Sequence, residues 1–88
     1  MKIKDGFLLK EVAGNHVVLP VGKMDFDGVI TLNETGVFIW KQLENSTTRE
    51  KILSAFLDVY EVSEEKARED LDAFLQILIK ADLIDEHA

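Results

Sequence analysis

A strand that turns directly into a helix, at residues 28–40, is the feature that most limits how this chain can fold. Residues 29–32 are β-branched or apolar and follow a glycine, which is typical of a strand. The side-chain oxygen of Asn33 can accept a hydrogen bond from a free N–H of the next turn, so we predict a helix cap there. Residues 37–40 are all apolar, which predicts a helix buried on more than one side. Gly36 has no Cβ, and we expect the helix to approach a neighbouring backbone there.

Two further strands are predicted before this segment. Residues 7–13 and 16–21 are short strand-like runs, and the Gly14-Asn15 pair between them favours a tight hairpin turn with positive φ. The resulting register places Val12 opposite Val17 and gives the sheet one mostly apolar face.

The third strand, formed by Val29, Ile30, Thr31 and Leu32, is expected to lie at an edge of this sheet. No later segment is a convincing strand partner for it. Exposed edge strands are usually protected by charges or proline, whereas this one is apolar. The pattern favours an edge to which something binds, with coverage by the protein's own terminus or loop as the alternative.

Three helices are predicted after the sheet. The first spans residues 34–44, and the second follows a capping box formed by Thr47 and Glu50. Ser63 caps the third helix, which extends to about residue 80. We expect positive φ at Asp82, a Leu83-Ile84 pair that folds back onto the core, and a loose tail over residues 85–88.

The apolar arc of the third helix is wider than one packed face requires. Ala73 and Ile77 form its shoulder, and Asp70 projects beside them. One interpretation is that this long helix contacts every other element, with Asp70 as a solvated rim residue. The other is that the shoulder lines a groove for a partner, where Asp70 accepts a hydrogen bond or pairs with a basic group.

Length, composition and charge limit which classes of function are possible for this chain. The chain has 88 residues, enough for one domain (1–88, core about 5–85), and no cysteine, which fits a cytoplasmic protein. No apolar run approaches the roughly 18 residues of a membrane span. Residues 48–88 hold eleven acidic and five basic residues of a chain whose net charge is −7. Phosphate binding needs clustered cations, so nucleic acid is an unfavourable partner for the helices.

Several segments together resemble the PqqD-like family. They are the Leu-Asn-Glu-Thr-Gly run at residues 32–36, the Ile-Trp pair at 39–40, the Asp-x-x-x-Phe-Leu-x-x-Leu pattern at 70–78, and the closing Leu-Ile at 83–84. The resemblance implies an α+β, winged helix-turn-helix-like domain with a three-stranded antiparallel sheet followed by three helices. One departure is the Ala-Asp pair at 81–82, where the family tends to have glycine.

The resemblance also implies a function. Members act in the biosynthesis of ribosomally made, modified peptides, including pyrroloquinoline quinone. They bind the leader segment of a precursor peptide as an added strand and present it to a modifying enzyme, often a radical S-adenosylmethionine (SAM) enzyme. Carried onto this sequence, the peptide-binding positions are Val29, Ile30, Thr31, Leu32, Asp70, Ala73, Phe74 and Ile77.

We find no constellation that predicts catalysis, a metal or a cofactor. His16 and His87 are the only histidines, and neither belongs to a pattern of further ligands. The function predicted is therefore a non-catalytic peptide-binding adaptor with no membrane partner. The alternatives are a winged-helix nucleic-acid-binding protein and a structural subunit of a larger enzyme complex.

Overall fold

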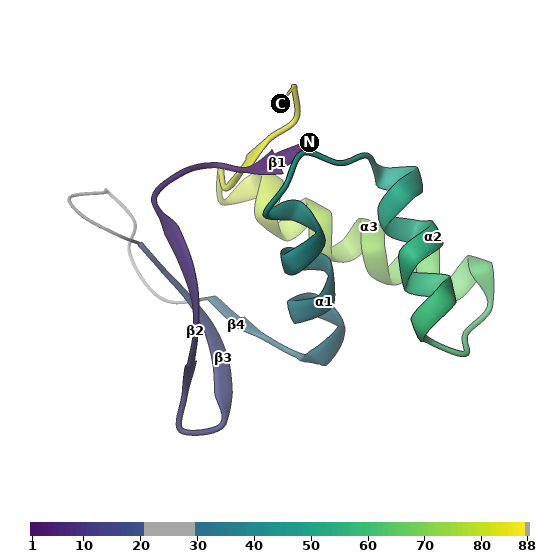
Figure 1. Cartoon of the computed structure of the whole chain (residues 1–88), viewed down its shortest axis with the longest axis horizontal. Helices are drawn as coiled ribbons and strands as arrows, with labels where there is room; N and C mark the ends of the chain where they lie inside the picture. Colours follow the sequence, from purple (N-terminus) through teal and green to yellow (C-terminus); the bar gives the residue numbers. More distant parts are fainter. Residues whose placement is uncertain (21–29, 88) are drawn as a thin grey trace.

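The computed structural model describes residues 1–20 and 30–87, so Val29, in the predicted third strand, lies outside the described residues. The architecture is α+β, with a three-stranded antiparallel sheet followed by three helices, as predicted (Figure 1). The sheet has the order β2-β3-β4, with β2 at Phe7–Val12, β3 at Asn15–Pro20 and β4 at Ile30–Leu32. The helices are α1 (Glu34–Leu43), α2 (Arg49–Val59) and α3 (Glu64–Lys80).

The hairpin turn lies one residue earlier than the sequence suggested, so the predicted register is wrong. Ala13 and Gly14 form the turn with φ of 52° and 82°, and Val12 pairs with Asn15 instead of Val17. A tight turn whose twist matches the strands needs positive φ at both central residues, and this pair supplies it. The register shifts by two residues, and because side chains alternate with period two, each residue keeps its predicted face.

Side-chain caps set the starts of the three helices. Asn33 Oδ1 accepts a hydrogen bond from Gly36 N at 2.8 Å, and Ser63 Oγ accepts one from Lys66 N at 3.1 Å, as predicted. The capping box predicted at Thr47 and Glu50 is wrong, because Thr48 is the cap of α2. Thr47 instead donates its backbone N–H to Met1 O at 2.9 Å, which ties it to the N-terminus before the helix begins.

A second, two-stranded sheet joins the chain ends. Strand β1 (Lys2–Ile3) pairs antiparallel with β5 (Ile84–Asp85), and no strand was predicted at either place. Asp82 has φ of 60°, and Leu83 and Ile84 are buried, as predicted.

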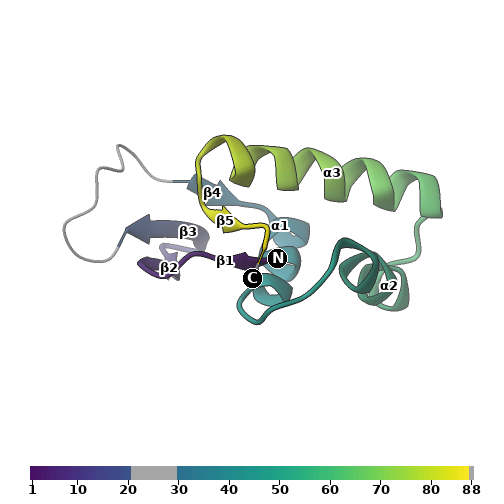
Figure 2. The ribbon, with the colours of Figure 1, turned by 90° about the horizontal axis from the view of Figure 1, so that it is seen from above.

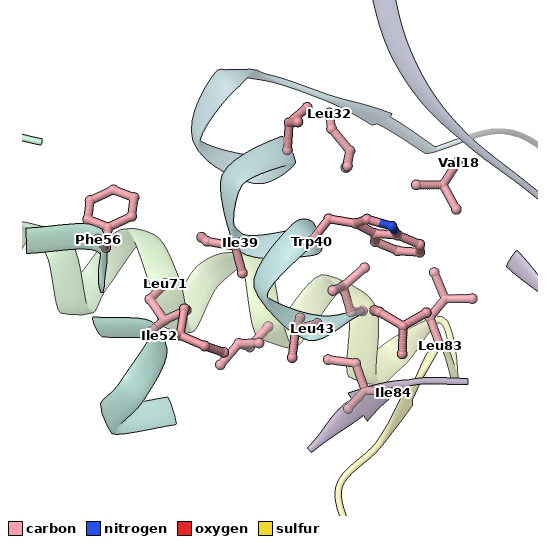
Figure 3. Close-up of a cluster of buried hydrophobic side chains, with 14 of the residues drawn as sticks. Val18, Leu32, Ile39, Trp40, Leu43, Ile52, Phe56, Leu71, Leu83 and Ile84 are labelled. Atoms are coloured by element: carbon pink, nitrogen blue, oxygen red, sulfur yellow. The ribbon is translucent and has the colours of Figure 1, made fainter. Parts of the chain in front are cut away.

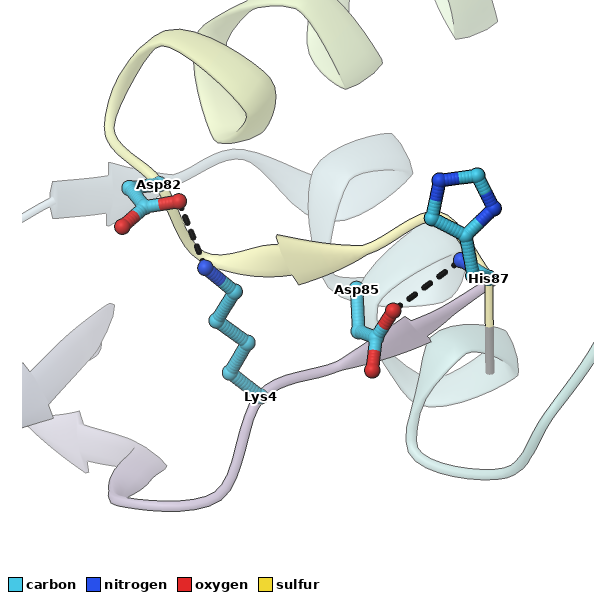
Figure 4. Close-up of polar contacts among 4 residues, drawn as sticks. All are labelled: Lys4, Asp82, Asp85 and His87. Atoms are coloured by element: carbon cyan, nitrogen blue, oxygen red, sulfur yellow. Dashed lines mark hydrogen bonds and ion pairs between the residues drawn. The ribbon is translucent and has the colours of Figure 1, made fainter.

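The predicted loose tail is wrong at its first residue. Asp85 pairs with Lys2 in the ladder, and Asp85 Oδ1 accepts a hydrogen bond from His87 N at 3.0 Å (Figure 4). Lys4 Nζ bonds Asp82 Oδ1 at 2.5 Å, which adds a second link between the two chain ends.

The hydrophobic core lies between the sheets and the helices. Trp40 is 2% exposed and lies on the side of the core where Val18 and Leu32 of the three-stranded sheet are found (Figure 3). The same cluster contains buried side chains from all three helices. Leu32 of β4 belongs to the same buried cluster as Leu71 and Leu78 of α3, so the strand and the helix share one core.

Candidate functional site

Strand β4 is an edge strand, as predicted. Its register with β3 pairs Ile30 with Val18 and Leu32 with His16. In the described parts of the chain, no strand pairs with the opposite side of β4. Figure 2 shows β4 between β3 and the C-terminal part of α3.

The tight hairpin determines which way the backbone groups of β3 point. Val12 and Asn15 flank the two-residue turn, so they form a hydrogen-bonded pair. Along an antiparallel strand the backbone groups point alternately to the two neighbours. The N–H and C=O groups of His16 and Val18 therefore point to β4.

The same alternation directs the backbone N–H and C=O groups of one β4 residue away from β3. Leu32 and Ile30, opposite His16 and Val18, direct their N–H and C=O groups to β3. Thr31 lies between them, so its donor and acceptor point to the open edge. The open edge thus offers the hydrogen-bond donor and acceptor of Thr31.

Two adjoining hollows run between this edge and α3, and together we call them the β4–α3 groove. The first has a volume of about 450 Å³ and is lined by Asn15, Ile30, Thr31, Leu32, Asn33, Phe74 and Ile77. The second has a volume of about 260 Å³ and is lined by Asn33, Thr35, Gly36, Asp70, Ala73, Phe74 and Ile77. Because they share Asn33, Phe74 and Ile77, the hollows form one continuous depression.

The groove brings together the predicted site residues that the structure describes, and Val29 lies outside the described residues. Those that line it are Ile30, Thr31, Leu32, Asp70, Ala73, Phe74 and Ile77. The sequence-based set omitted Asn15, Asn33, Thr35 and Gly36. The sequence marked Asn33 as a helix cap and Gly36 as a position that needs a small residue. Nothing in the sequence related either residue to α3.

The apolar shoulder of α3 faces the groove. Ile77 is 53% exposed and Ala73 is also exposed, so the interpretation that the whole wide arc packs inward is wrong for these two residues. Phe74 is half-buried, and its ring lies beside Gly36. A Cβ on Gly36 would stand 3.1 Å from Phe74 Cε1. The atoms closest to such a Cβ belong to side chains, and not to the neighbouring backbone that we expected.

Asp70 is the one charged residue among those lining the groove. Its Oδ1 lies 3.1 Å from Lys66 Nζ, one helical turn away, and its side chain is 36% exposed. A second carboxylate of α3, Asp72, lies outside the groove lining and binds α2. Arg49 donates from Nε to Asp72 Oδ1 at 2.6 Å and from Nη2 to Oδ2 at 2.8 Å. These bonds lower the pKa of Asp72 and raise that of Arg49.

Neither a cluster of metal ligands nor a membrane-spanning helix is found among the described residues. Across residues 1–20 and 30–87, no group of three or more histidine, aspartate or glutamate side chains is placed to hold a metal ion. Within the same residues, none of the helices combines the length and apolarity needed to cross a bilayer.

The fold and groove define a small α+β domain of the winged-helix type with an open edge strand beside its longest helix. The family model described as coenzyme PQQ synthesis protein D (PqqD) matches residues 15–84, and the chain belongs to this family. Among solved structures, it is similar to TbiB1 in complex with the TbiA(beta) leader peptide. The two share 27% sequence identity with a TM-score of 0.79, over 100% of this chain and 99% of the other. No curated protein matches the chain.

Proposed function

We propose that this protein is a non-catalytic adaptor that binds the leader segment of a ribosomally synthesised precursor peptide. The leader adds as a strand to the open edge of β4, against α3, and the adaptor presents it to a modifying enzyme. The observation that carries the proposal is the open edge of β4 beside a largely uncharged groove. Membership of the PqqD family and the similarity to TbiB1, solved with a leader peptide, support it.

Strand addition suits the chemistry of this edge. The backbone N–H and C=O groups of the acceptor strand supply affinity, and the pockets beside it select alternate side chains of the guest. Thr31 offers the hydrogen bonds, while Phe74 and Ile77 offer apolar contact. An open apolar edge strand promotes aggregation unless something binds there. Binding of a guest peptide accounts for an edge strand that is left uncovered.

The enzyme that receives the leader is, in this proposal, a radical SAM enzyme, as the resemblance to the PqqD-like family implies. The absence of cysteine agrees with a role in the cytoplasm. The residues that would contact the leader are Ile30, Thr31, Leu32, Asp70, Ala73, Phe74 and Ile77. Val29, predicted from the sequence, lies outside the described residues.

Nucleic-acid binding is a poor alternative for this winged-helix plan. Three cations of α2 and α3 are already paired with carboxylates, namely Arg49 with Asp72, Lys66 with Asp70, and Arg68 with Glu64. Counterion release requires cations that are available to phosphates. These helices offer few such cations.

The test is a titration of the ¹⁵N-labelled domain with peptides that span the N-terminal segments of precursor peptides encoded beside its gene. We expect amide shifts concentrated on β4 and α3. Thr31→Pro removes the outward N–H and should weaken binding strongly. Ile77→Asp places a charge in the apolar wall, and it should weaken binding while leaving the free energy of unfolding nearly unchanged.

Matched variants separate loss of the site from loss of the fold. Glu11→Pro is the control for Thr31→Pro. Glu11 lies in β2, the opposite edge strand, and the same alternation points its N–H away from β3. Leu8→Asp is the control for Ile77→Asp. Leu8 is 52% exposed, close to the 53% of Ile77, but it lies outside the groove. Binding that survives Thr31→Pro and Ile77→Asp, or that falls equally in both controls, would contradict the proposal.

A further inference from the structure

The register of β4 sets which side chains of a guest strand enter the groove, provided that the proposed strand addition occurs. Thr31 is exposed and lies on the outer face, while Ile30 and Leu32 lie on the inner face towards the core. In either orientation, the guest residue directly opposite Thr31 also points its side chain outward. Its two neighbours point inward, separated by about 6.6 Å, since each strand residue advances roughly 3.3 Å. Two guest side chains, two residues apart, therefore meet the groove.

The two hollows that receive these side chains differ in chemistry. The two hollows share Asn33, Phe74 and Ile77, and the first adds Ile30 and Leu32 with the uncharged polar residues Asn15 and Thr31, so it includes no charged residue. The second lies towards the start of α1, where Asn33 and Thr35 meet Asp70. One hollow suits an apolar side chain, and the other combines polar groups with a carboxylate.

The carboxylate of Asp70 has capacity for another hydrogen bond. Its Oδ1 pairs with Lys66, whose side chain is 60% exposed, and its Oδ2 has no partner among the described residues. An exposed pair one helical turn apart contributes little to stability, so it is easily exchanged. A carboxylate accepts most strongly from a cationic donor.

We propose that the groove selects a leader segment with an apolar residue and, two residues away, a residue that donates a hydrogen bond to Asp70. Lysine and arginine are the preferred donors, ahead of neutral hydroxyls. Asp70 lies on α3 beside the Asn33 end of β4. In a guest antiparallel to β4, the donor residue therefore precedes the apolar one, and a parallel guest reverses this order.

The test is a selection of binders from a display library of short random peptides, run in parallel against the wild-type domain, Asp70→Asn, Asp70→Ala and Asp70→Lys. With the wild type, we expect enrichment of lysine or arginine two residues from an apolar position. Asp70→Ala should bind the wild-type consensus peptide about tenfold more weakly, the effect of losing one charge-assisted hydrogen bond. Asp70→Asn, which keeps an acceptor, should recover part of the affinity, and Asp70→Lys should enrich aspartate or glutamate at the same position.

The outcomes distinguish this inference from the proposed function. If all four domains select the same residues at that position, the inference is wrong, although strand addition stands as long as Thr31→Pro abolishes binding. If the consensus peptides bind Thr31→Pro as well as the wild type, or if no peptide is enriched, both proposals are wrong. Glu69 is an exposed acidic neighbour of Asp70 outside the groove lining. The Glu69→Ala variant should therefore bind the consensus peptide as tightly as the wild type.

Discussion

At the scale of single residues, the turn at Ala13 and Gly14 determines which backbone groups face the open edge. The hydrogen-bonded pair that flanks this turn sets the alternation along β3, and that alternation leaves Thr31 facing outward. Ala13 adopts φ of 52°, where its Cβ is unfavourable, whereas Gly14 tolerates its own φ of 82°. The turn that sets the register therefore stores strain at one residue.

Relieving that strain should stabilise the domain. Asparagine is favoured at the first position of this kind of turn, so we expect Ala13→Asn to raise the free energy of unfolding by about 0.5–1 kcal/mol in urea titration. Ala73→Asn is the matched control, because the same change in the middle of α3 should lower it by roughly 0.5 kcal/mol. Equal effects at the two positions would show that the turn is not strained.

At the scale of elements, a surface ion pair holds α2 against α3. Arg49 and Asp72 form a bidentate pair across the two helices, with side chains 29% and 52% exposed. The pair lowers the pKa of the Asp72 carboxyl from its ordinary 3.8. Because the folded pKa is the lower one, the contribution to stability is present above the ordinary value and disappears as pH falls through the lowered value.

The downward shift of the Asp72 pKa gives a pH-dependent prediction. At pH 7, Asp72→Asn should reduce the free energy of unfolding by about 0.5–1 kcal/mol, the range for a well-formed exposed pair. As pH falls below about 4, the difference between the wild type and the variant should shrink, and it should vanish below the lowered pKa of folded Asp72, as measured by urea denaturation across the pH range. Asp58→Asn, on the exposed surface of α2, should show no such loss. A difference between the wild type and Asp72→Asn that persists at low pH would exclude the pair as its cause.

At the scale of the whole molecule, the two ends of the chain close the core. Ile3 pairs with Ile84 in the ladder of β1 and β5, and both side chains are buried. Leu83, at the exit of α3, is completely buried in the same cluster. The C-terminal end of α3, which forms one wall of the groove, is thereby fixed to the N-terminus.

Loss of this closure should therefore destabilise the whole domain. We expect Ile84→Ala to lower the free energy of unfolding by about 2–4 kcal/mol, from lost burial and the cavity left behind. Asp85→Ala, at the next and exposed position, should change it by at most about 0.5 kcal/mol. Both values come from urea titration followed by circular dichroism. A small loss in Ile84→Ala would mean that the terminal sheet contributes little to the fold.

Local patterns in the sequence determined most of the elements. Two strand-like runs predicted the hairpin, and Asn33 and Ser63 marked helix starts, because a cap bonds to residues only three positions away. The open edge of β4 also followed from the sequence, since no later segment was a plausible partner. The described members of the predicted site, which came from the resemblance to the PqqD-like family, all line one groove. Helix periodicity by itself had marked only Ala73, Ile77 and Asp70.

Tertiary structure alone decided the features that depend on residues far apart in the chain. The pairing of Lys2–Ile3 with Ile84–Asp85 joins two segments too short to carry a strand pattern. Thr47, the predicted cap of α2, instead donates its N–H to Met1 O, a residue 46 positions away, and Thr48 caps the helix. Gly36 became part of the groove through its contact with Phe74. Local patterns record which face a residue presents, but the neighbour that meets this face is chosen by packing of the whole core.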